Sequence, residues 1–213
     1  MQKILLLILI CCISVLSFGQ RYSIDGVIKK ADSLLTASVG KDIFKECFRL
    51  DSTSYFETKT TFHRAKIRYL TKTKRTNGKL RLISVRYDFY IKLFNPYITT
   101  SVVFDQYLHL KQPIETSFIP QFIWNKTENN FLSEIDALQT AKAKFVKKGL
   151  KPLGATLTYD SYRKLYLWTV TNITAEYKGY NDEISREVEF LEIDAINGKI
   201  LNYYPAALQG PIH

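Results

Sequence analysis

The stretch that decides the fold class of this chain lies near its C-terminus and reads Ile193-Asp194-Ala195-Ile196-Asn197-Gly198-Lys199-Ile200-Leu201. An Asn-Gly pair stands there between two runs rich in aliphatic residues. Both central positions of a type I′ turn need a positive φ, which Asn and Gly adopt readily. The pattern therefore predicts an antiparallel hairpin that joins residues 188–195 to residues 199–204. We expect Asp194 to end the first strand by accepting hydrogen bonds from the turn backbone, and Asp105 to do the same in an earlier strand.

A helix is predicted upstream of this hairpin. The sequence Ser133-Glu134-Ile135-Asp136 resembles a capping box, with Asp in the place of the usual Glu or Gln. Apolar residues then recur at helical spacing until Gly149 and Pro152 end the helix. The expected apolar face consists of Ile135, Leu138, Ala141 and Phe145. Runs of β-branched and aromatic residues follow at 153–159 and 165–174, so the helix precedes an antiparallel meander.

The same order of elements is predicted in the first half of the chain. Ser23 opens a helix whose apolar residues recur every three or four positions, and Gly40 caps its C-terminus. The strand-like runs that follow are residues 43–50, 62–71, 80–93 and 98–110. Asn77-Gly78 separates the second run from the third and predicts another type I′ hairpin.

Together these elements predict an α+β protein made of two tandem units, each a helix packed on an antiparallel meander. A parallel α/β sheet is disfavoured because helices do not alternate with single strands. The predicted divisions are a signal peptide at residues 1–19, a first unit at 20–111, a proline-containing linker at 112–131 and a second unit at 132–213.

Residues 132–204 resemble a PepSY domain, a small exported module in which a helix lies across an antiparallel sheet. The stretch from Asp194 to Leu201 matches the closing hairpin of that family, whose pattern is D-A-x-x-G-K-[IV]-L. The other matching features are Asp136-Ala137, Ala141-Lys142 and Tyr166-Leu167-Trp168-Thr169-Val170. Residues 23–111 resemble the module more faintly, with Val102-Val103-Phe104-Asp105 in the place of Leu191-Glu192-Ile193-Asp194.

This resemblance implies a non-catalytic module of cystatin-like architecture. Such modules are associated with the restraint of peptidases or with protein contacts outside the cytoplasm. The Gln-x-Val-x-Gly loop with which cystatins block cysteine proteases is absent from this sequence. The implied role is therefore protein binding without a cysteine-protease wedge of that type.

The N-terminus has the organisation of a signal peptide. Lys3 precedes an apolar run at residues 4–16, and Ser17-Phe18-Gly19 places small residues at the −3 and −1 positions of a cleavage site. The run is short for a membrane-spanning helix, which needs about 20 residues, and an uncleaved anchor is the alternative. The bulky Ile10 before Cys11 argues against a lipid-modified cysteine. We expect a periplasmic or extracellular protein.

The composition is that of a folded globular protein. The 213 residues are 46% hydrophobic and 23% charged, and scarce glycine and proline exclude collagen-like and low-complexity classes. Cleavage after Gly19 would leave Cys47 as the single cysteine, so no internal disulfide is expected. The fold must then rest on its hydrophobic core, which about 190 residues can supply.

No catalytic, cofactor or metal site is predicted. The histidines His63, His109 and His213 show no spacing typical of metal ligands. Cys47 has apolar neighbours, which favour a buried position over the role of a nucleophile. Nucleophile elbows, phosphate loops and dinucleotide fingerprints are missing from the sequence. A secreted hydrolase that uses a carboxylate or Cys47 stays open as a third function class.

Paired carboxylates, which many secreted hydrolases use, give no clear site. Glu187 and Glu189 share a strand face with Leu191 and Ile193 by the period of two. Because neither glutamate stands alone in an apolar stretch, the sequence does not support a catalytic acid–base pair.

The distribution of charge singles out one segment. Cleavage would leave 29 Lys and Arg against 20 Asp and Glu, a net charge of +9. Ten of the basic residues lie within residues 58–87, where no Asp or Glu occurs. A two-residue loop at Asn77-Gly78 would place Lys74 opposite Arg81 and create one cationic stripe. The candidate residues for binding an anionic partner are Arg64, Lys66, Arg68, Lys74 and Arg81.

Two functions from different classes follow from this segment. The first is an exported non-catalytic module that binds a protein partner, with restraint of a peptidase as one such role. The second is a cell-envelope protein that binds a polyanion through residues 59–86, with an affinity that falls steeply with salt. Nucleic acid is disfavoured as that polyanion outside the cytoplasm. The purely structural alternative is that basic residues on an exposed strand prevent edge-to-edge aggregation.

Overall fold

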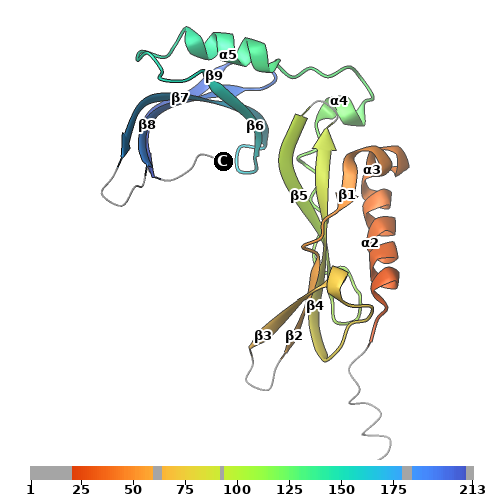
Figure 1. The fold of residues 1–213 in the computed structure, drawn as a ribbon. Helices are drawn as coiled ribbons and strands as arrows, with labels where there is room; N and C mark the ends of the chain where they lie inside the picture. The colour runs from red at the N-terminus through yellow and green to blue at the C-terminus, as the bar shows by residue number, and fades with distance from the viewer. Residues whose placement is uncertain (1–20, 60–63, 92–93, 179–183, 210–213) are drawn as a thin grey trace, which may run out of the picture. The chain divides into compact units, whose positions relative to one another are not determined.

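A computed structural model describes residues 21–59, 64–91, 94–178 and 184–209, and the predicted signal peptide lies outside them. The described residues form two antiparallel sheets and four α-helices, so the α+β class is confirmed (Figure 1). Contacts between residues divide the chain into two compact units. The first contains the residues up to Phe89 together with Thr99–Thr116, and the second contains Tyr90–Ile98 together with the residues from Ser117 onward.

The first unit begins with helix α2, Ile24–Val39, which confirms the predicted helix. Ser23 Oγ accepts a hydrogen bond from the N–H of Gly26 and caps the N-terminus. Gly40 has a φ of 87° and its N–H donates to the carbonyl of Thr36, so the predicted C-terminal cap is confirmed as well. The side chains that the helix buries are Ile24, Val27, Ala31, Leu35 and Val39.

The strand expected over residues 43–50 is wrong in its first part. The structure has helix α3 there, Lys41–Cys47, and only Phe48–Leu50 forms strand β1. The ring of Phe44, on α3, lies edge-on to Tyr87 with centroids 6.1 Å apart. A helical turn therefore brings the half-buried ring of Phe44, which the sequence pattern assigned to a strand, against Tyr87.

The first sheet is not the simple meander that the sequence predicted. Its further strands are β2 (Tyr55–Lys59), β3 (Ala65–Tyr69), β4 (Lys79–Ile91) and β5 (Phe94–Asp105), and the 3-10 helix η1 (Leu70–Lys72) follows β3. The strand order is β1-β4-β2-β3, with β5 also paired to β4. The two short strands β1 and β2 thus pair with successive parts of the long strand β4.

The core of the first unit lies between this sheet and α2, which runs along it (Figure 1). Alternate residues of β4, among them Ile83, Val85 and Tyr87, are fully buried. The Tyr87 hydroxyl donates to Asp32 Oδ1 of α2 over 2.7 Å. Burial, together with this carboxylate, raises the pKa of Tyr87 far above its usual value. Tyr87 is therefore a neutral hydrogen-bond donor that ties the helix to the sheet.

The second sheet has the predicted meander order. Its strands are β6 (Gly154–Asp160), β7 (Leu165–Lys178), β8 (Ile184–Asp194) and β9 (Ile200–Gln209), each antiparallel to the next. The closing hairpin of β8 and β9 is confirmed, and Gly198 has the expected positive φ, of 70°. Its loop is longer than a two-residue turn, because Ile193 pairs with Ile200.

Both predicted strand-ending aspartates are confirmed. Asp194 Oδ1 accepts a hydrogen bond from the N–H of Ile196 over 2.8 Å. Asp105 Oδ1 accepts hydrogen bonds of 2.8 Å from the N–H groups of Tyr107 and His109. In each unit, a carboxylate thus satisfies backbone donors where a long strand ends.

Helix α5, Glu134–Lys142, begins where the sequence predicts, with Ser133 Oγ accepting from the N–H of Asp136. It ends at Lys142, so Phe145 lies beyond the helix and not on its apolar face. Ala137 and Ala141 are buried, and the helix packs on β6 and β7. The short helix therefore covers only part of this face of the second sheet.

The residues before α5, expected as a linker, carry structure of their own. They include the short helix α4, Gln121–Trp124. The Tyr166 hydroxyl donates to the carbonyl of Phe118 over 2.6 Å, and Trp168 Nε1 donates to that of Leu132 over 2.9 Å. The buried side chains of this segment are Phe118, Ile119, Phe122 and Phe131. They contribute to the core of the second unit.

Candidate binding surface

The basic residues of the first unit are arranged differently from the predicted hairpin. Strand β3 pairs with β2 and not with β4, so Lys66 lies opposite Thr58 and Arg68 opposite Phe56. The expected pairing of Lys74 with Arg81 across Asn77-Gly78 is therefore wrong. Lys74 belongs to the loop between η1 and β4.

Hydrogen bonds to the start of α2 prevent this loop from forming a tight hairpin. The carbonyl of Lys74 accepts from the N–H of Ile24, and Thr76 exchanges two hydrogen bonds with the backbone of Tyr22. Gly78 has the positive φ that the Asn-Gly signal requires, yet the chain around it does not reverse as a two-residue turn. These long-range bonds outweigh the local preference of the Asn-Gly pair.

Arg81 lies on the other face of the sheet from Lys66 and Arg68. Its Nη1 forms an ion pair with Glu57 Oε2 at 3.4 Å, and Glu57 is the β2 residue opposite Ile67. Because neighbouring residues of a strand point to opposite faces, Ile67 and Arg81 share one face and Lys66 and Arg68 the other. The five candidate residues therefore do not form a single stripe.

What the structure brings together is an edge strand with basic and apolar side chains on alternate faces. We call residues Lys66, Ile67, Arg68 and Tyr69 the basic edge strand. β3 is terminal in its sheet, and β2 is its partner among the described strands. Ile67 is 54% exposed and Tyr69 is 44% exposed, which is high for large apolar side chains in a strand.

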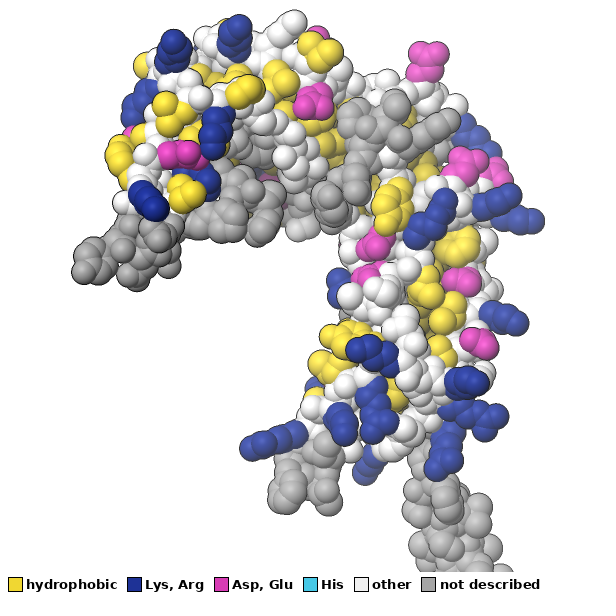
Figure 2. Space-filling view, in the orientation of Figure 1, with side chains coloured by type: hydrophobic (Ala, Val, Ile, Leu, Met, Phe, Trp, Pro, Cys, Tyr) yellow, Lys and Arg dark blue, Asp and Glu magenta, His cyan; other side chains and the backbone are white. Residues whose placement is uncertain are grey.

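Further positive charge surrounds the basic edge strand. Arg64 lies two residues before Lys66, and Lys72 Nζ lies 5.6 Å from the centre of the Tyr69 ring. Lys59 of β2 lies opposite Lys79 of β4, a like-charge pair that is unfavourable in the absence of a counter-charge. Figure 2 shows the dark blue Lys and Arg side chains gathered around β2 and β3.

A cavity of about 520 Å³ lies next to this region, at the N-terminal end of α2. Lys74 lines it together with Leu50, Ser54 and Leu70. The cavity lies beside residues 51–54, the segment between β1 and β2, which we call the break between these strands. Lys74 therefore contributes its charge to this cavity rather than to the edge strand.

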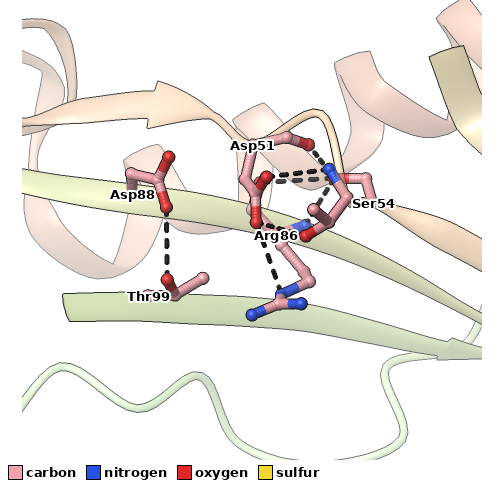
Figure 3. Close-up of polar contacts among 6 residues, drawn as sticks. Asp51, Ser54, Arg86, Asp88 and Thr99 are labelled. Atoms are coloured by element: carbon pink, nitrogen blue, oxygen red, sulfur yellow. Dashed lines mark hydrogen bonds and ion pairs between the residues drawn. The ribbon is translucent and has the colours of Figure 1, made fainter. Parts of the chain in front are cut away.

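The break between β1 and β2 is held by polar contacts with β4 (Figure 3). Ser54 Oγ accepts from the N–H of Arg86 over 2.9 Å, and Asp51 Oδ2 lies 3.5 Å from Arg86 Nε. Partial burial of Asp51 favours a higher pKa, but hydrogen bonds from Thr53 and the charge of Arg86 outweigh it and lower the pKa. The break is thus fixed by a charged aspartate at neutral pH.

The residues weighed for catalysis show no shared site. Cys47 is half-buried at the end of α3, and burial raises the pKa of its thiol, which disfavours a reactive thiolate. His109 Nδ1 lies 3.3 Å from Asp105 Oδ2, while His63 and His213 lie outside the described residues. Within the residues that the structure describes, no group of three or more His, Cys, Asp and Glu side chains could hold a metal ion.

Sequence reasoning missed a buried polar cluster in the second unit. Glu189, only 3% exposed, accepts hydrogen bonds from Asn172 Nδ2 and the Tyr203 hydroxyl. The available signal was the period of two, which places Asn172 on the same face as the buried Trp168 and Val170. A polar side chain at a core position of a strand needs a hydrogen-bond partner inside the protein.

Comparison of the chain with protein-family models, curated proteins and solved structures finds no match. In the described part of the chain, no helix is both long enough and apolar enough to cross a membrane.

Proposed function

We propose that this chain is an exported, non-catalytic binding protein that captures an acidic, extended segment of a partner protein along the basic edge strand. The observation that carries the proposal is the position of β3 at the end of its sheet. A strand in that position has backbone N–H and C=O groups on its outer side with which another strand can pair.

Charge and apolar surface both favour an acidic peptide as the added strand. Lys66 and Arg68 present two cations on one face of the edge, and Ile67 and Tyr69 present apolar surface on the other. A peptide strand with acidic residues at alternate positions would place them beside Lys66 and Arg68 and its apolar residues beside Ile67 and Tyr69.

The resemblance of residues 132–204 to a PepSY domain supports a role in protein contacts outside the cytoplasm. Support comes from α5 lying on a four-stranded meander whose last hairpin carries the D-A-x-x-G-K-I-L sequence. Restraint of a peptidase is the specific form of this role that the resemblance implies.

A second candidate function is the binding of a cell-envelope polyanion through residues 59–86. The observation that favours it is the like-charge pair of Lys59 and Lys79 in a segment that holds no acidic residue. A flexible polyanion would neutralise these charges without pairing with the edge of the sheet.

The test is a binding assay with an extended peptide of about eight residues that alternates Glu and Val. We expect the mature chain to bind it with an affinity that falls as salt is raised. Replacing both Lys66→Gln and Arg68→Gln should weaken binding by about ten-fold, because two charge contacts are lost. The pair Lys41→Gln and Lys45→Gln removes the same charge from α3 and should leave the affinity unchanged.

A peptide of the same sequence with an N-methyl group on every residue separates the two functions. It keeps every charge but cannot donate the backbone hydrogen bonds of a paired strand. Weak binding of this peptide supports strand addition. If both peptides bind with equal affinity, and dextran sulfate binds as tightly as they do, the polyanion function would replace the proposal.

A further inference from the structure

A second cavity, of about 570 Å³, lies in the second unit where α5 ends. The irregular segment that follows the helix forms much of its lining, and β7 contributes Asn172. Phe145 and Leu153 give the cavity apolar lining, while Lys142 and Lys148 give it charge. Apolar walls with a few polar groups are typical of sites for small molecules.

Asn172 supplies a hydrogen-bond acceptor that the protein leaves unused. The residue is 1% exposed, and its Nδ2 donates to the carbonyl of Lys147 over 3.0 Å and to Glu189 Oε2 over 2.8 Å. These two acceptors fix the orientation of the amide, because a flipped amide would set its oxygen against them. Oδ1 then has no hydrogen-bond partner among the described residues.

The buried Glu189 holds Asn172 in this orientation. One carboxylate oxygen accepts from Asn172, and the other accepts from the Tyr203 hydroxyl over 2.6 Å. Glu189 is therefore a positioning residue, because it holds Asn172 Nδ2 on its own side and leaves Oδ1 on the other.

Gly149 keeps a side chain away from this oxygen. A Cβ atom at position 149 would lie 2.2 Å from Asn172 Oδ1, and Gly149 itself lines the cavity. Because native proteins seldom leave a buried acceptor without a donor, an orphan oxygen at a cavity wall marks a place for a donor from outside the chain.

The lysines around the cavity differ in what they contact. Lys147 forms an ion pair with Glu187, and Lys151 forms one with Glu176. Lys142 and Lys148 line the cavity as exposed side chains. The cavity therefore offers positive charge at its opening, and Asn172 Oδ1 lies buried directly behind the Gly149 part of its wall, so a ligand reaches this oxygen when Gly149 shifts.

We propose that this cavity binds a small organic anion in which an N–H group stands next to a carboxylate, as in an N-acyl amino acid or the last residue of a peptide. Lys142 and Lys148 attract the carboxylate, and the N–H donates to Asn172 Oδ1. An apolar side chain of the ligand packs against Phe145 and Leu153. The site uses no residue of the basic edge strand, so it does not depend on the function proposed above.

The test is a titration of the ¹⁵N-labelled mature chain with N-acetyl-leucine, followed by NMR. We expect saturable shifts of the Asn172 side-chain amide and of the Gly149 backbone amide. N-acetyl-leucine amide lacks the carboxylate, and N-acetyl-N-methyl-leucine lacks the donor. Each should bind about ten-fold more weakly, because each loses one charged or buried hydrogen bond.

Two variants complete the test. Lys148→Ala should weaken the binding of N-acetyl-leucine several-fold, whereas Lys144→Ala, an exposed lysine of the same segment outside the cavity lining, should not change it. A short peptide ending in leucine separates the two sources of the ligand. Tighter binding of the peptide identifies a chain end, and tighter binding of N-acetyl-leucine identifies a free acyl amino acid.

Three results would overturn the site. These are no shift of Asn172 at millimolar N-acetyl-leucine, equal affinity for all three ligands, and equal weakening by Lys144→Ala and Lys148→Ala. Binding of the acidic peptide to the basic edge strand would be unaffected by any of them.

Discussion

Gly149 illustrates at the scale of one residue how a missing side chain shapes its surroundings. Its φ is not in the left-handed region, so its backbone would accept other residues. The constraint is steric, because the space where a Cβ would stand is already occupied by Asn172 Oδ1. Glycine is needed here for its size and not for its conformational freedom.

Gly149→Ala should therefore destabilise the protein. Its Cβ would lie 2.2 Å from Asn172 Oδ1 and 3.1 Å from the carbonyl oxygen of Lys151, so one of them must move. We expect a loss of about 1–3 kcal/mol in the free energy of unfolding, measured by denaturant titration.

The matched control is Gly154→Ala, at the first position of β6. A Cβ there meets no atom within 4 Å. We expect this variant to be neutral or slightly stabilised, because alanine restricts the unfolded chain. Equal losses in the two variants would show that Gly149 is not sterically required.

Single residues with local roles were predictable from the sequence. Ser23 and Ser133 cap their helices, and Asp105 and Asp194 close their strands, because each bonds backbone groups within a few positions of itself. Arg81 was not predictable in this way. Its partner Glu57 is distant in sequence, and only the register of β2 on β4 brings the two together.

At the scale of elements, the break between β1 and β2 is the clearest case of a polar contact that shapes a sheet. Asp51 and Ser54 both bond to Arg86, which belongs to the strand that β1 and β2 share (Figure 3). The break is thus a fixed part of the sheet rather than a loop over it.

Asp51→Asn should lower stability at neutral pH by about 1 kcal/mol, because the charge that faces Arg86 is lost. The pKa of Asp51 is lower in the folded chain than in the unfolded chain, where it is about 4. The stabilisation by this carboxylate is therefore complete above that value and disappears as the pH falls through the lowered folded pKa.

Unfolding free energies of both proteins, measured from pH 7 down to about pH 2, would check this expectation. The difference between wild type and Asp51→Asn should narrow toward the acidic end. A difference that stays constant over the whole range would mean that the aspartate charge does not stabilise the break.

The elements that sequence reasoning missed are the short ones. Residues 41–47 hold too few apolar positions to separate a helical from a strand period, and β2 carries Glu57 and Lys59, which weaken a strand signal. Missing β2 removed the true partner of β3, so the basic residues were assigned to the wrong hairpin. Helix α2 and the strands β4, β6 and β7 were predicted close to their observed bounds, whereas α5 ends at Lys142, well before the predicted end at Gly149, and β5 is Phe94–Asp105 instead of 98–110.

At the scale of the whole molecule, the chain contains two hydrophobic cores, each with its own helix and sheet. Ala31 on α2 and Ala141 on α5 are both fully buried. Neither position has room for a larger side chain unless its core shifts.

Calorimetry should therefore resolve two unfolding transitions, each belonging to one unit. Ala31→Leu should lower one transition and Ala141→Leu the other, each by about 5 °C or more, because overpacking costs about 1–3 kcal/mol. A single transition that both variants lower equally would show that the two units unfold together.

The topology of β4 has a consequence for the time course of folding. Strand β4 cannot complete its pairing until β1, near residue 48, and β2 have both reached it, so the chain must close long loops first. In the second unit each strand pairs with the one that follows it, and every loop is short by comparison. We therefore expect the second unit, although it is synthesised last, to fold faster than the first unit. Folding of the first unit should then be the slower step for the whole chain.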